Sequence, residues 1–306
     1  MEELRKPDWL KIRPAHNTDF SKIKGALRKR GLVTVCEEAH CPNMAECWHN
    51  EGTATFMVLG DTCTRGCKFC AVKTSRKGNP VDPFEPKKLA EAIAEMQLDY
   101  AVITSVDRDD LPDEGASHFA RCISEIKKAH PKTNVEVLIP DFSGKPELLK
   151  KIVDAMPDVI AHNVETVKSL QRKVRDPRAG YEQSLKVLEN IKRMDQKIFS
   201  KSALMLGLGE TREEVVQAMK DLRSVGCDIL TIGQYLKPKN KFLKVEEYVK
   251  PEAFEEYKRI GESLGFLYVA SGPFVRSSYR AGELFIKNLI DKKNSASKEV
   301  GLSQET

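Results

Sequence analysis

Three cysteines lie close together in the segment CTRGCKFC, as Cys63, Cys67 and Cys70. A disulfide uses two thiols, and a structural zinc site usually has four ligands, often arranged as Cys-x2-Cys pairs. Thiolates are soft ligands that suit iron–sulfur clusters. A [4Fe–4S] cluster held by three cysteines would leave one iron free for another ligand. The segment therefore indicates an iron–sulfur centre with an open coordination position, and a zinc knuckle is the alternative.

A second set of three cysteines precedes the first, in CEEAHCPNMAEC, as Cys36, Cys41 and Cys47. Again no fourth thiol is adjacent. His40 or His49 could complete a Cys₃His zinc site, so this set is ambiguous when it is taken alone.

The composition is that of an ordinary globular protein: 306 residues, 41% hydrophobic, 31% charged, with a net charge of +5. This basic excess is too weak to indicate nucleic-acid binding. No apolar run is long enough for a membrane span, and the N-terminus lacks the apolar core of a signal peptide. We expect a cytoplasmic protein, in which eight cysteines suggest metal or redox chemistry rather than disulfides. Two of them, Cys122 and Cys227, fall in apolar patterns and are predicted to be core residues.

Short apolar runs alternate with helical patterns from about residue 54 onward. The predicted strands are 54–60, 99–105, 134–140, 158–166, 201–209, 227–235 and 266–272. The predicted helices are 87–97, 116–129, 146–156, 181–194, 212–226 and 251–265. Near-continuously apolar strands are typical of parallel strands that are covered on both faces. We therefore predict an α/β fold, a partial (β/α)6-type TIM barrel, with an open doubly wound sheet as the competing topology.

Polar and glycine-rich segments follow the predicted strands, among them GDTCTRGC, SVDRDDL, PDFSG, NVET, GLGET and GQYLKPKNK. In both topologies ligands bind at the C-terminal ends of the strands. The cysteine segment 63–70 follows the first of these strands, so the predicted metal centre falls at the barrel mouth.

A Cys-x3-Cys-x2-Cys segment after the first strand of an α/β barrel resembles the radical S-adenosylmethionine enzymes. The resemblance implies that the open iron binds the amine and carboxylate of the methionine part of the cofactor. An electron from the cluster would then cleave the cofactor and yield a 5′-deoxyadenosyl radical.

The order of both cysteine sets is similar to that of the lipoyl synthase family, over about residues 4–290. Further matching stretches are LRKPDWLKIR, ITSVDRDDLPDEGA, AHNVETV, VRDPRAGYEQSL, MLGLGETREE, IGQYLKP and RSSY (276–279). The resemblance implies two [4Fe–4S] clusters, the second an auxiliary cluster at Cys36, Cys41 and Cys47. Its fourth ligand would be a serine of RSSY, which we assign to Ser278, with Ser277 as the second candidate.

The activity implied by the resemblance is insertion of two sulfur atoms at C6 and C8 of a protein-bound octanoyl-lysine group. Two S-adenosylmethionine molecules would be consumed, and the auxiliary cluster would donate the sulfur. The C–H bonds are unactivated, so the clusters carry the chemistry and no catalytic acid or base is expected. Implied partners are octanoylated lipoyl carriers (acyltransferase subunits of 2-oxoacid dehydrogenases and the glycine cleavage H protein), a ferredoxin or flavodoxin, and an iron–sulfur carrier for cluster repair. The lysine-rich segment 236–244 could also dock an acidic carrier domain.

Several polar or glycine residues at the strand ends are candidates for contacts to S-adenosylmethionine: Ser105, Asn163, Glu165, Arg175, Gly207, Gly209 and Glu210. Glycines permit close approach of an adenosine ring. A plain turn before a helix capped by Thr211 would explain GLGET equally well. One departure from the family is Glu114, where glycine is most common.

The expected organisation has four parts: an N-terminal extension with the auxiliary cysteines (1–52), a barrel core (53–272), a segment with RSSY (273–290) and a disordered tail (291–306). The two extensions would cover the barrel mouth. Two other functions remain as alternatives. An RNA-modifying methylthiotransferase would require an added RNA-binding domain, and a zinc-dependent scaffold would contain no iron.

Overall fold

The computed structural model describes residues 4–10, 25, 27, 30–35, 55–239, 241–278 and 290. A 3-10 helix, η1 (Asp8–Leu10), and a short strand, β1 (Val33–Thr34), lie in the first part. The auxiliary cysteines and the predicted tail, 291–306, lie outside the described residues. The predicted division into four parts therefore stays a prediction.

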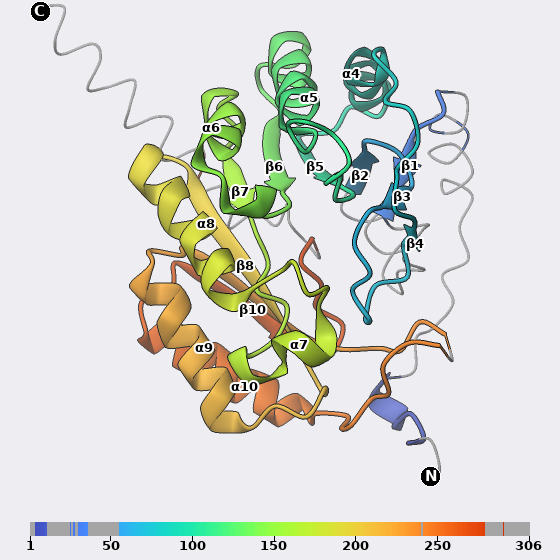
Figure 1. Cartoon of the computed structure of the whole chain (residues 1–306). Coiled ribbons are helices and arrows are strands. Elements are labelled where there is room, and N and C mark those ends of the chain that lie inside the picture. Colours follow the sequence, from blue (N-terminus) through green and yellow to red (C-terminus); the bar gives the residue numbers. More distant parts are fainter. Residues whose placement is uncertain are drawn as a thin grey trace, which may run out of the picture.

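Strands and helices alternate through the core (Figure 1). The strands are β2 (Thr55–Val58), β3 (Thr62–Cys63), β4 (Lys73–Thr74), β5 (Tyr100–Ser105), β6 (Asn134–Leu138), β7 (Val159–Ala161), β8 (Phe199–Leu206), β9 (Ile229–Gln234) and β10 (Tyr268–Gly272). The helices are α4 (Glu85–Glu95), α5 (Ala116–Ala129), α6 (Pro146–Asp154), α7 (Gln171–Val174), α8 (Tyr181–Met194), α9 (Arg212–Ser224) and α10 (Pro251–Ser263), with 3-10 turns η2 (Phe142–Gly144) and η3 (Lys168–Leu170).

The main sheet has the order β1-β2-β5-β6-β7-β8-β9-β10. All neighbouring strands are parallel except β1 and β2, which are antiparallel. The sheet is curved, and the long helices lie along its outer side (Figure 1). Parallel order in chain sequence, with a helix between successive strands, is the topology of a barrel wall and confirms the predicted α/β fold. Among the described strands, no hydrogen bonds join β1 to β10 at the two edges of the sheet. The described strands therefore form a partial barrel, as predicted.

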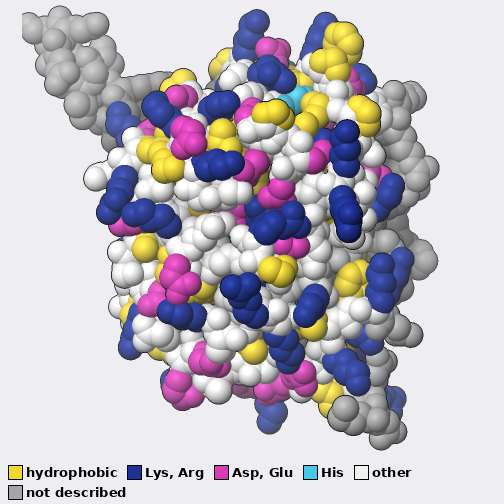
Figure 2. All heavy atoms as spheres, in the orientation of Figure 1, with side chains coloured by type: hydrophobic (Ala, Val, Ile, Leu, Met, Phe, Trp, Pro, Cys, Tyr) yellow, Lys and Arg dark blue, Asp and Glu magenta, His cyan; other side chains and the backbone are white. Residues whose placement is uncertain are grey.

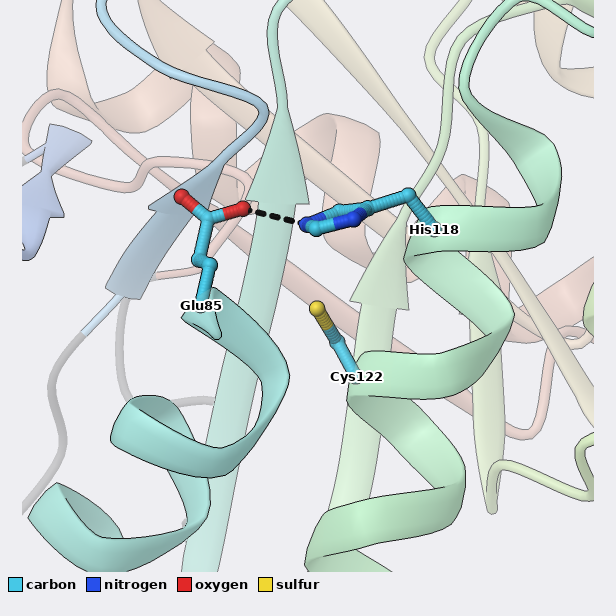
Figure 3. Close-up of side chains that lie close together, drawn as sticks. All are labelled: Glu85, His118 and Cys122. Carbon is cyan, nitrogen blue, oxygen red and sulfur yellow. Dashed lines mark hydrogen bonds and ion pairs between the residues drawn. The ribbon is translucent and has the colours of Figure 1, made fainter. Parts of the chain in front are cut away.

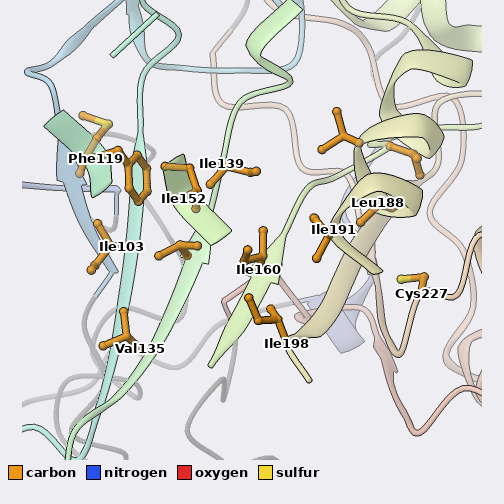
Figure 4. Packing of buried hydrophobic residues seen from close by; sticks show 14 of the residues in the cluster. Ile103, Phe119, Val135, Ile139, Ile152, Ile160, Leu188, Ile191, Ile198 and Cys227 are labelled. Carbon is orange, nitrogen blue, oxygen red and sulfur yellow. The ribbon is translucent and has the colours of Figure 1, made fainter. Parts of the chain in front are cut away.

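Apolar side chains fill the space between the sheet and the helices. Figure 4 shows Ile103, Val135 and Ile160 of three adjacent strands facing the helix side chains Phe119, Ile152 and Leu188. All six are fully buried. Successive strand residues point to opposite faces, so Tyr100 and Val102 belong instead to a second apolar cluster, with Val159 and Ile229. Both faces of the strands are thus covered, as their composition predicts, and Cys122 and Cys227 are buried in the outer core.

A buried ion pair lies within the sheet. Lys201 of β8 lies 2.7 Å from the Glu136 carboxylate of β6, and each side chain is only 1% exposed. Tyr100 donates a hydrogen bond to the other Glu136 oxygen at 2.7 Å. A pair of this kind contributes little net stability, but each charge needs the other because an unpaired buried charge is costly.

Helix starts follow local sequence signals. Thr211 caps α9, as predicted: its side chain accepts a hydrogen bond from the Glu214 amide. The Thr211 amide in turn donates to the Glu214 carboxylate, which completes a capping box that was not predicted. Proline occupies the first turn of α4, α6 and α10, where its missing N–H costs nothing. The strand predicted over 158–166 is shorter in the structure: β7 ends at Ala161, and beyond it only an isolated parallel bridge pairs Glu165 with Leu204 of β8.

Asp113 stabilises the start of α5 in its ionised form. Its carboxylate accepts from the Ser117 amide at 2.9 Å and from the Gly115 amide at 3.2 Å. Burial raises the pKa of Asp113, but the Ser117 and Gly115 hydrogen bonds outweigh burial and lower it from 3.8 to about 2. Stabilisation by a carboxylate with a depressed pKa is complete above about pH 4 and is lost as the pH falls through about 2.

We therefore expect Asp113→Asn to lower the free energy of unfolding at pH 7 by about 1 kcal/mol, because the Asn side chain carries no charge and its single oxygen can accept from only one of the two backbone amides. Urea unfolding measured across pH should show this difference shrinking between about pH 4 and pH 2. A difference that stayed constant over this range would contradict the assigned role of the charge.

Candidate functional site

The three cysteines of CTRGCKFC line one cavity at the C-terminal ends of the parallel strands. The cavity has a volume of about 610 Å³. Residues from β5, β6, β8 and β9 form its walls, and the loops after β2 and β9 and the segment after β10 border it. Cys63 ends β3, and the amide of Cys70 donates to the Cys67 carbonyl at 3.1 Å, which turns the loop between them. The cysteine loop therefore lies at the C-terminal ends of the strands, as the sequence predicts.

Arg65 fastens the cysteine loop to the sheet. Its guanidinium contacts three carboxylates: Asp141 at 2.7 Å, Asp109 at 2.8 Å and Asp107 at 3.3 Å. The Arg65 side chain is 4% exposed and that of Asp141 is fully buried. Burial raises the pKa of Asp141, but the Arg65 hydrogen bond and charge more than offset it and keep that pKa below its usual value. This network was not predicted from the sequence.

A second anchor comes from the segment after α7. Asp176 accepts from the Gly66 amide at 2.7 Å, and the Asp176 amide donates to the Cys67 sulfur at 3.3 Å. Arg178 donates to the Thr64 carbonyl at 2.7 Å and to Asp176 at 2.8 Å. Two chain segments that are distant in sequence therefore hold the loop from both sides.

The thiols lie in surroundings that disfavour their ionised form unless a cation is present. Burial, and then the nearby carboxylate of Asp107, raise the pKa of Cys63 to about 12. Burial is also the largest cause that raises the pKa of Cys67 to about 12 and the pKa of Cys70 above its usual value. Cys63 and Cys67 each interact electrostatically with Cys70. Three converging thiols of this kind suit a metal cluster, because the metal's charge stabilises the thiolate.

Polar atoms without partners point to a further ligand beside the thiols. Ser105 Oγ, Asn163 Oδ1 and Thr231 Oγ1 are buried, make no hydrogen bond among the described residues, and belong to side chains that line the cavity. Buried polar groups in proteins normally have a partner. The polar groups of S-adenosylmethionine would supply such partners, so the residues present fit this cofactor. Thr231 was missed by the sequence analysis because it lies within an apolar strand.

Two other predicted contacts also line the cavity. Glu165 receives a hydrogen bond from the Asn163 amide group at 3.1 Å, and burial, opposed by the charge of Arg175, raises its pKa. Arg175 donates to Gln171 at 3.2 Å and to Ser184 at 2.9 Å, so part of its role is structural. Their contacts to the cofactor stay a prediction.

The GLGET segment does not line this cavity. Gly207 and Gly209 have φ of 97° and 108°, and a Cβ on Gly207 would come within 2.4 Å of the Glu247 carbonyl oxygen. Glu210 folds back to accept from the Leu208 amide at 3.0 Å and from the Gly207 amide. The turn before α9 accounts for this geometry, and a cofactor role for Gly207, Gly209 and Glu210 stays a prediction.

Ser277 and Ser278 line the same cavity as the three cysteines. These two serines therefore share the cavity with the cysteine loop, and their role as ligands of the auxiliary cluster stays a prediction. The remaining predicted ligands, Cys36, Cys41 and Cys47, lie outside the described residues.

A Glu–His–Cys group on the outer side of the sheet resembles a metal site, but its histidine is occupied by hydrogen bonds to protein side chains. Figure 3 shows Glu85 of α4 with His118 and Cys122 of α5. Arg121 can only donate, and it lies 3.2 Å from His118 Nδ1, so Nε2 carries the proton that goes to Glu85 at 2.6 Å. His118 therefore has no free lone pair for a metal.

Glu114, the departure from the family pattern, does not line the cavity. Its carboxylate pairs with Lys145 at 2.7 Å, and its backbone is left-handed, with φ of 50°. A left-handed backbone disfavours any residue with a Cβ, which gives glycine a physical advantage at this position.

Two substitutions at this position should separate the backbone effect from the ion pair. Glu114→Ala loses the pair and keeps the strain, so we expect a loss of about 1 kcal/mol in the free energy of unfolding. Glu114→Gly also loses the pair but relieves the strain, and should stay within about 0.5 kcal/mol of the unmodified protein. Denaturant titration measures both, and an alanine variant as stable as the glycine variant would contradict the prediction.

Family models and individual relatives agree on the class of protein. A model of the Radical SAM superfamily matches residues 57–222, and a model of the N-terminal domain of lipoyl synthase matches residues 1–41. Lipoyl synthase of Halobacterium salinarum is 56% identical over 299 residues, covering 96% of both chains. Chloroplastic lipoyl synthase of Ricinus communis is 55% identical over 298 residues, covering 96% of this chain and 82% of the relative.

Solved structures share the fold at low sequence identity. Methylornithine synthase has a TM-score of 0.53 at 13% identity and covers 92% of this chain and 93% of its own. The FeFe-hydrogenase maturase HydG of Carboxydothermus hydrogenoformans has a TM-score of 0.52 at 14% identity, covering 88% and 77%. These likenesses confirm the radical SAM fold alone.

The barrel wall, the three-cysteine loop and the superfamily match together define a radical S-adenosylmethionine enzyme. Within this class, the chain belongs to the lipoyl synthase family. Its cofactors are those of the family, S-adenosylmethionine and two [4Fe–4S] clusters. None of the helices in the described part of the chain is long and apolar enough to cross a membrane.

Proposed function

We propose that the cavity is where a protein-bound octanoyl-lysine group receives sulfur at C6 and C8. The radical cluster would be held by Cys63, Cys67 and Cys70, and the auxiliary cluster by Cys36, Cys41, Cys47 and Ser278. The observation that carries this proposal is the shared cavity, since the three thiols and the RSSY serines line one space.

The cavity walls suit both substrate and cofactor. Apolar side chains, among them Val106, Ile139 and Met205, line it and would hold the octanoyl tail. The buried polar atoms of Ser105, Asn163 and Thr231 would bind the polar groups of the cofactor. When bound, the two clusters supply the electron for radical formation and the sulfur. The protein's own task is to position the reacting carbon and to keep water away.

Partners and location follow from this function as proposals. The carriers would be octanoylated acyltransferase subunits of 2-oxoacid dehydrogenases and the glycine cleavage H protein. A ferredoxin or flavodoxin would deliver electrons, and an iron–sulfur carrier would rebuild the auxiliary cluster. We place the reaction in the cytoplasm.

Anaerobic reconstitution tests the proposal directly. The protein should contain about eight irons per chain, because each [4Fe–4S] centre has its own ligand set. With a reductant and S-adenosylmethionine, an octanoyl-lysine peptide should gain two sulfur atoms while two 5′-deoxyadenosine molecules form. Cofactor cleavage without sulfur transfer would refute the proposed reaction, and a zinc-containing, iron-free protein would refute the clusters.

A further inference from the structure

Two segments beside the cavity are rich in basic residues and contain no acidic ones. Segments 62–81 and 235–245 together carry nine Lys and Arg residues and no Asp or Glu. The rest of the chain has 41 basic and 45 acidic residues, so the overall charge of +5 arises from these two segments. We define the basic rim as their exposed cationic side chains, Lys68, Lys73, Arg76, Lys77, Lys239, Lys241 and Lys244.

The two segments form one continuous surface. The Leu243 amide donates to the Lys68 carbonyl at 3.3 Å, and Phe69 and Leu243 pack in the same apolar cluster. Tyr235 donates to the Leu243 carbonyl at 3.0 Å, which fixes the second segment. Figure 2 shows Lys and Arg side chains along the side of the molecule that holds β3, β4 and the segment before α10, with few acidic side chains among them.

The rim borders the entrance of the cavity. Phe69 and Thr74 of the first segment and Lys237 and Pro238 of the second line the cavity itself. A group that is attached to another protein and enters the cavity must bring that protein's surface close to these segments.

The charges of the rim are not used to hold the fold. Among the described residues, no ion pair joins a rim side chain to a carboxylate, whereas exposed lysines elsewhere form them, as Lys150 does with Asp154 at 2.6 Å. Two acidic residues that adjoin the segments in sequence bond to other groups. Asp61 accepts from Thr62 and Asn79, each at 2.7 Å, and the charge of Lys73 acts on it without an ion pair. Glu246 pairs with Lys173 at 3.0 Å. Unneutralised charges of one sign beside an active-site entrance attract a partner of opposite charge and raise its association rate.

We infer that the basic rim docks the acidic face of the small carrier domain whose octanoyl-lysine enters the cavity. This inference rests on the proposed function. It adds the surface that recognises the carrier and the sign of charge that the carrier must present around its modified lysine.

Charge reversal tests the rim, with octanoylated glycine cleavage H protein as the carrier. The variant Lys239→Glu, Lys241→Glu, Lys244→Glu changes exposed side chains that do not line the cavity. The matched control Lys87→Glu, Lys128→Glu, Lys220→Glu makes the same change in net charge on the outer helices α4, α5 and α9. Both variants are reconstituted with iron and sulfide and assayed against the carrier and against a short octanoyl-lysine peptide without acidic residues.

The rim variant should raise KM for the carrier by about tenfold or more at low salt, and the difference should shrink at high salt. Turnover of the peptide should stay unchanged, and the control variant should resemble the unmodified protein with both substrates. An unchanged KM for the carrier, an equal loss with the peptide, or an equal loss in the control would overturn the inference. A protein that converts neither substrate before any substitution would instead overturn the proposed function.

Discussion

Replacing Cys67 by alanine is expected to abolish formation of 5′-deoxyadenosine. Cys67 lines the cavity with Cys63 and Cys70, and its sulfur also accepts a hydrogen bond from the Asp176 amide at 3.3 Å. Two remaining thiolates leave a cluster with two exposed irons, which the loop cannot retain. Loss of an outer partner of a metal site usually costs 10–100-fold, so loss of a ligand should cost more than about 100-fold in activity.

Metal analysis distinguishes cluster loss from general damage. Iron should fall from about eight to about four per chain, because the auxiliary ligand set is separate. Cys122→Ala is the matched control, since Cys122 is a free thiol that is fully buried in the outer core. Its iron content and radical formation should match those of the unmodified protein. Full iron content in Cys67→Ala, or equal iron loss in both variants, would contradict the assignment.

Much of the fold was predictable because strands that are buried on both faces are rich in apolar residues. The strands β5, β6, β8 and β9 lie where the sequence predicts and are almost wholly buried, since helices cover one face and the barrel interior the other. The cap at Thr211 was predictable because both partners of a capping box lie within four residues.

The site was predictable only where its chemistry is local. The cysteine loop carries its ligands in eight consecutive residues, so spacing alone indicates a cluster. Thr231 gives no such signal, because a threonine in an apolar strand is ordinary until its hydroxyl is found buried without a partner. The network at Arg65 joins carboxylates from the loops after β5 and β6, and such a contact depends on strand order rather than on neighbours in sequence.

The Arg65 network leads to the second large effect. Arg65→Met would leave the fully buried carboxylate of Asp141 without its cation, and Asp109, 18% exposed, would lose its bidentate partner. Breaking a buried ion pair from one side usually costs 3–5 kcal/mol. We expect the free energy of unfolding, measured by denaturant titration, to fall by about 3–5 kcal/mol, with weaker iron retention because the cysteine loop loses its main anchor.

Geometry as well as charge should determine this loss. Arg65→Lys keeps the positive charge, but one ammonium group cannot reproduce the planar contacts to two or three carboxylates, so it should recover only part of the stability. Arg212→Met is the matched control: its guanidinium pairs with Glu256 at the surface, where both side chains are about half exposed, and its removal should cost less than about 1 kcal/mol. If Arg65→Met were as mild as Arg212→Met, or Arg65→Lys were fully stable with complete iron content, the loop would not depend on this network. In that case Asp176, which accepts from the Gly66 amide at 2.7 Å, would be left as the main anchor of the cysteine loop.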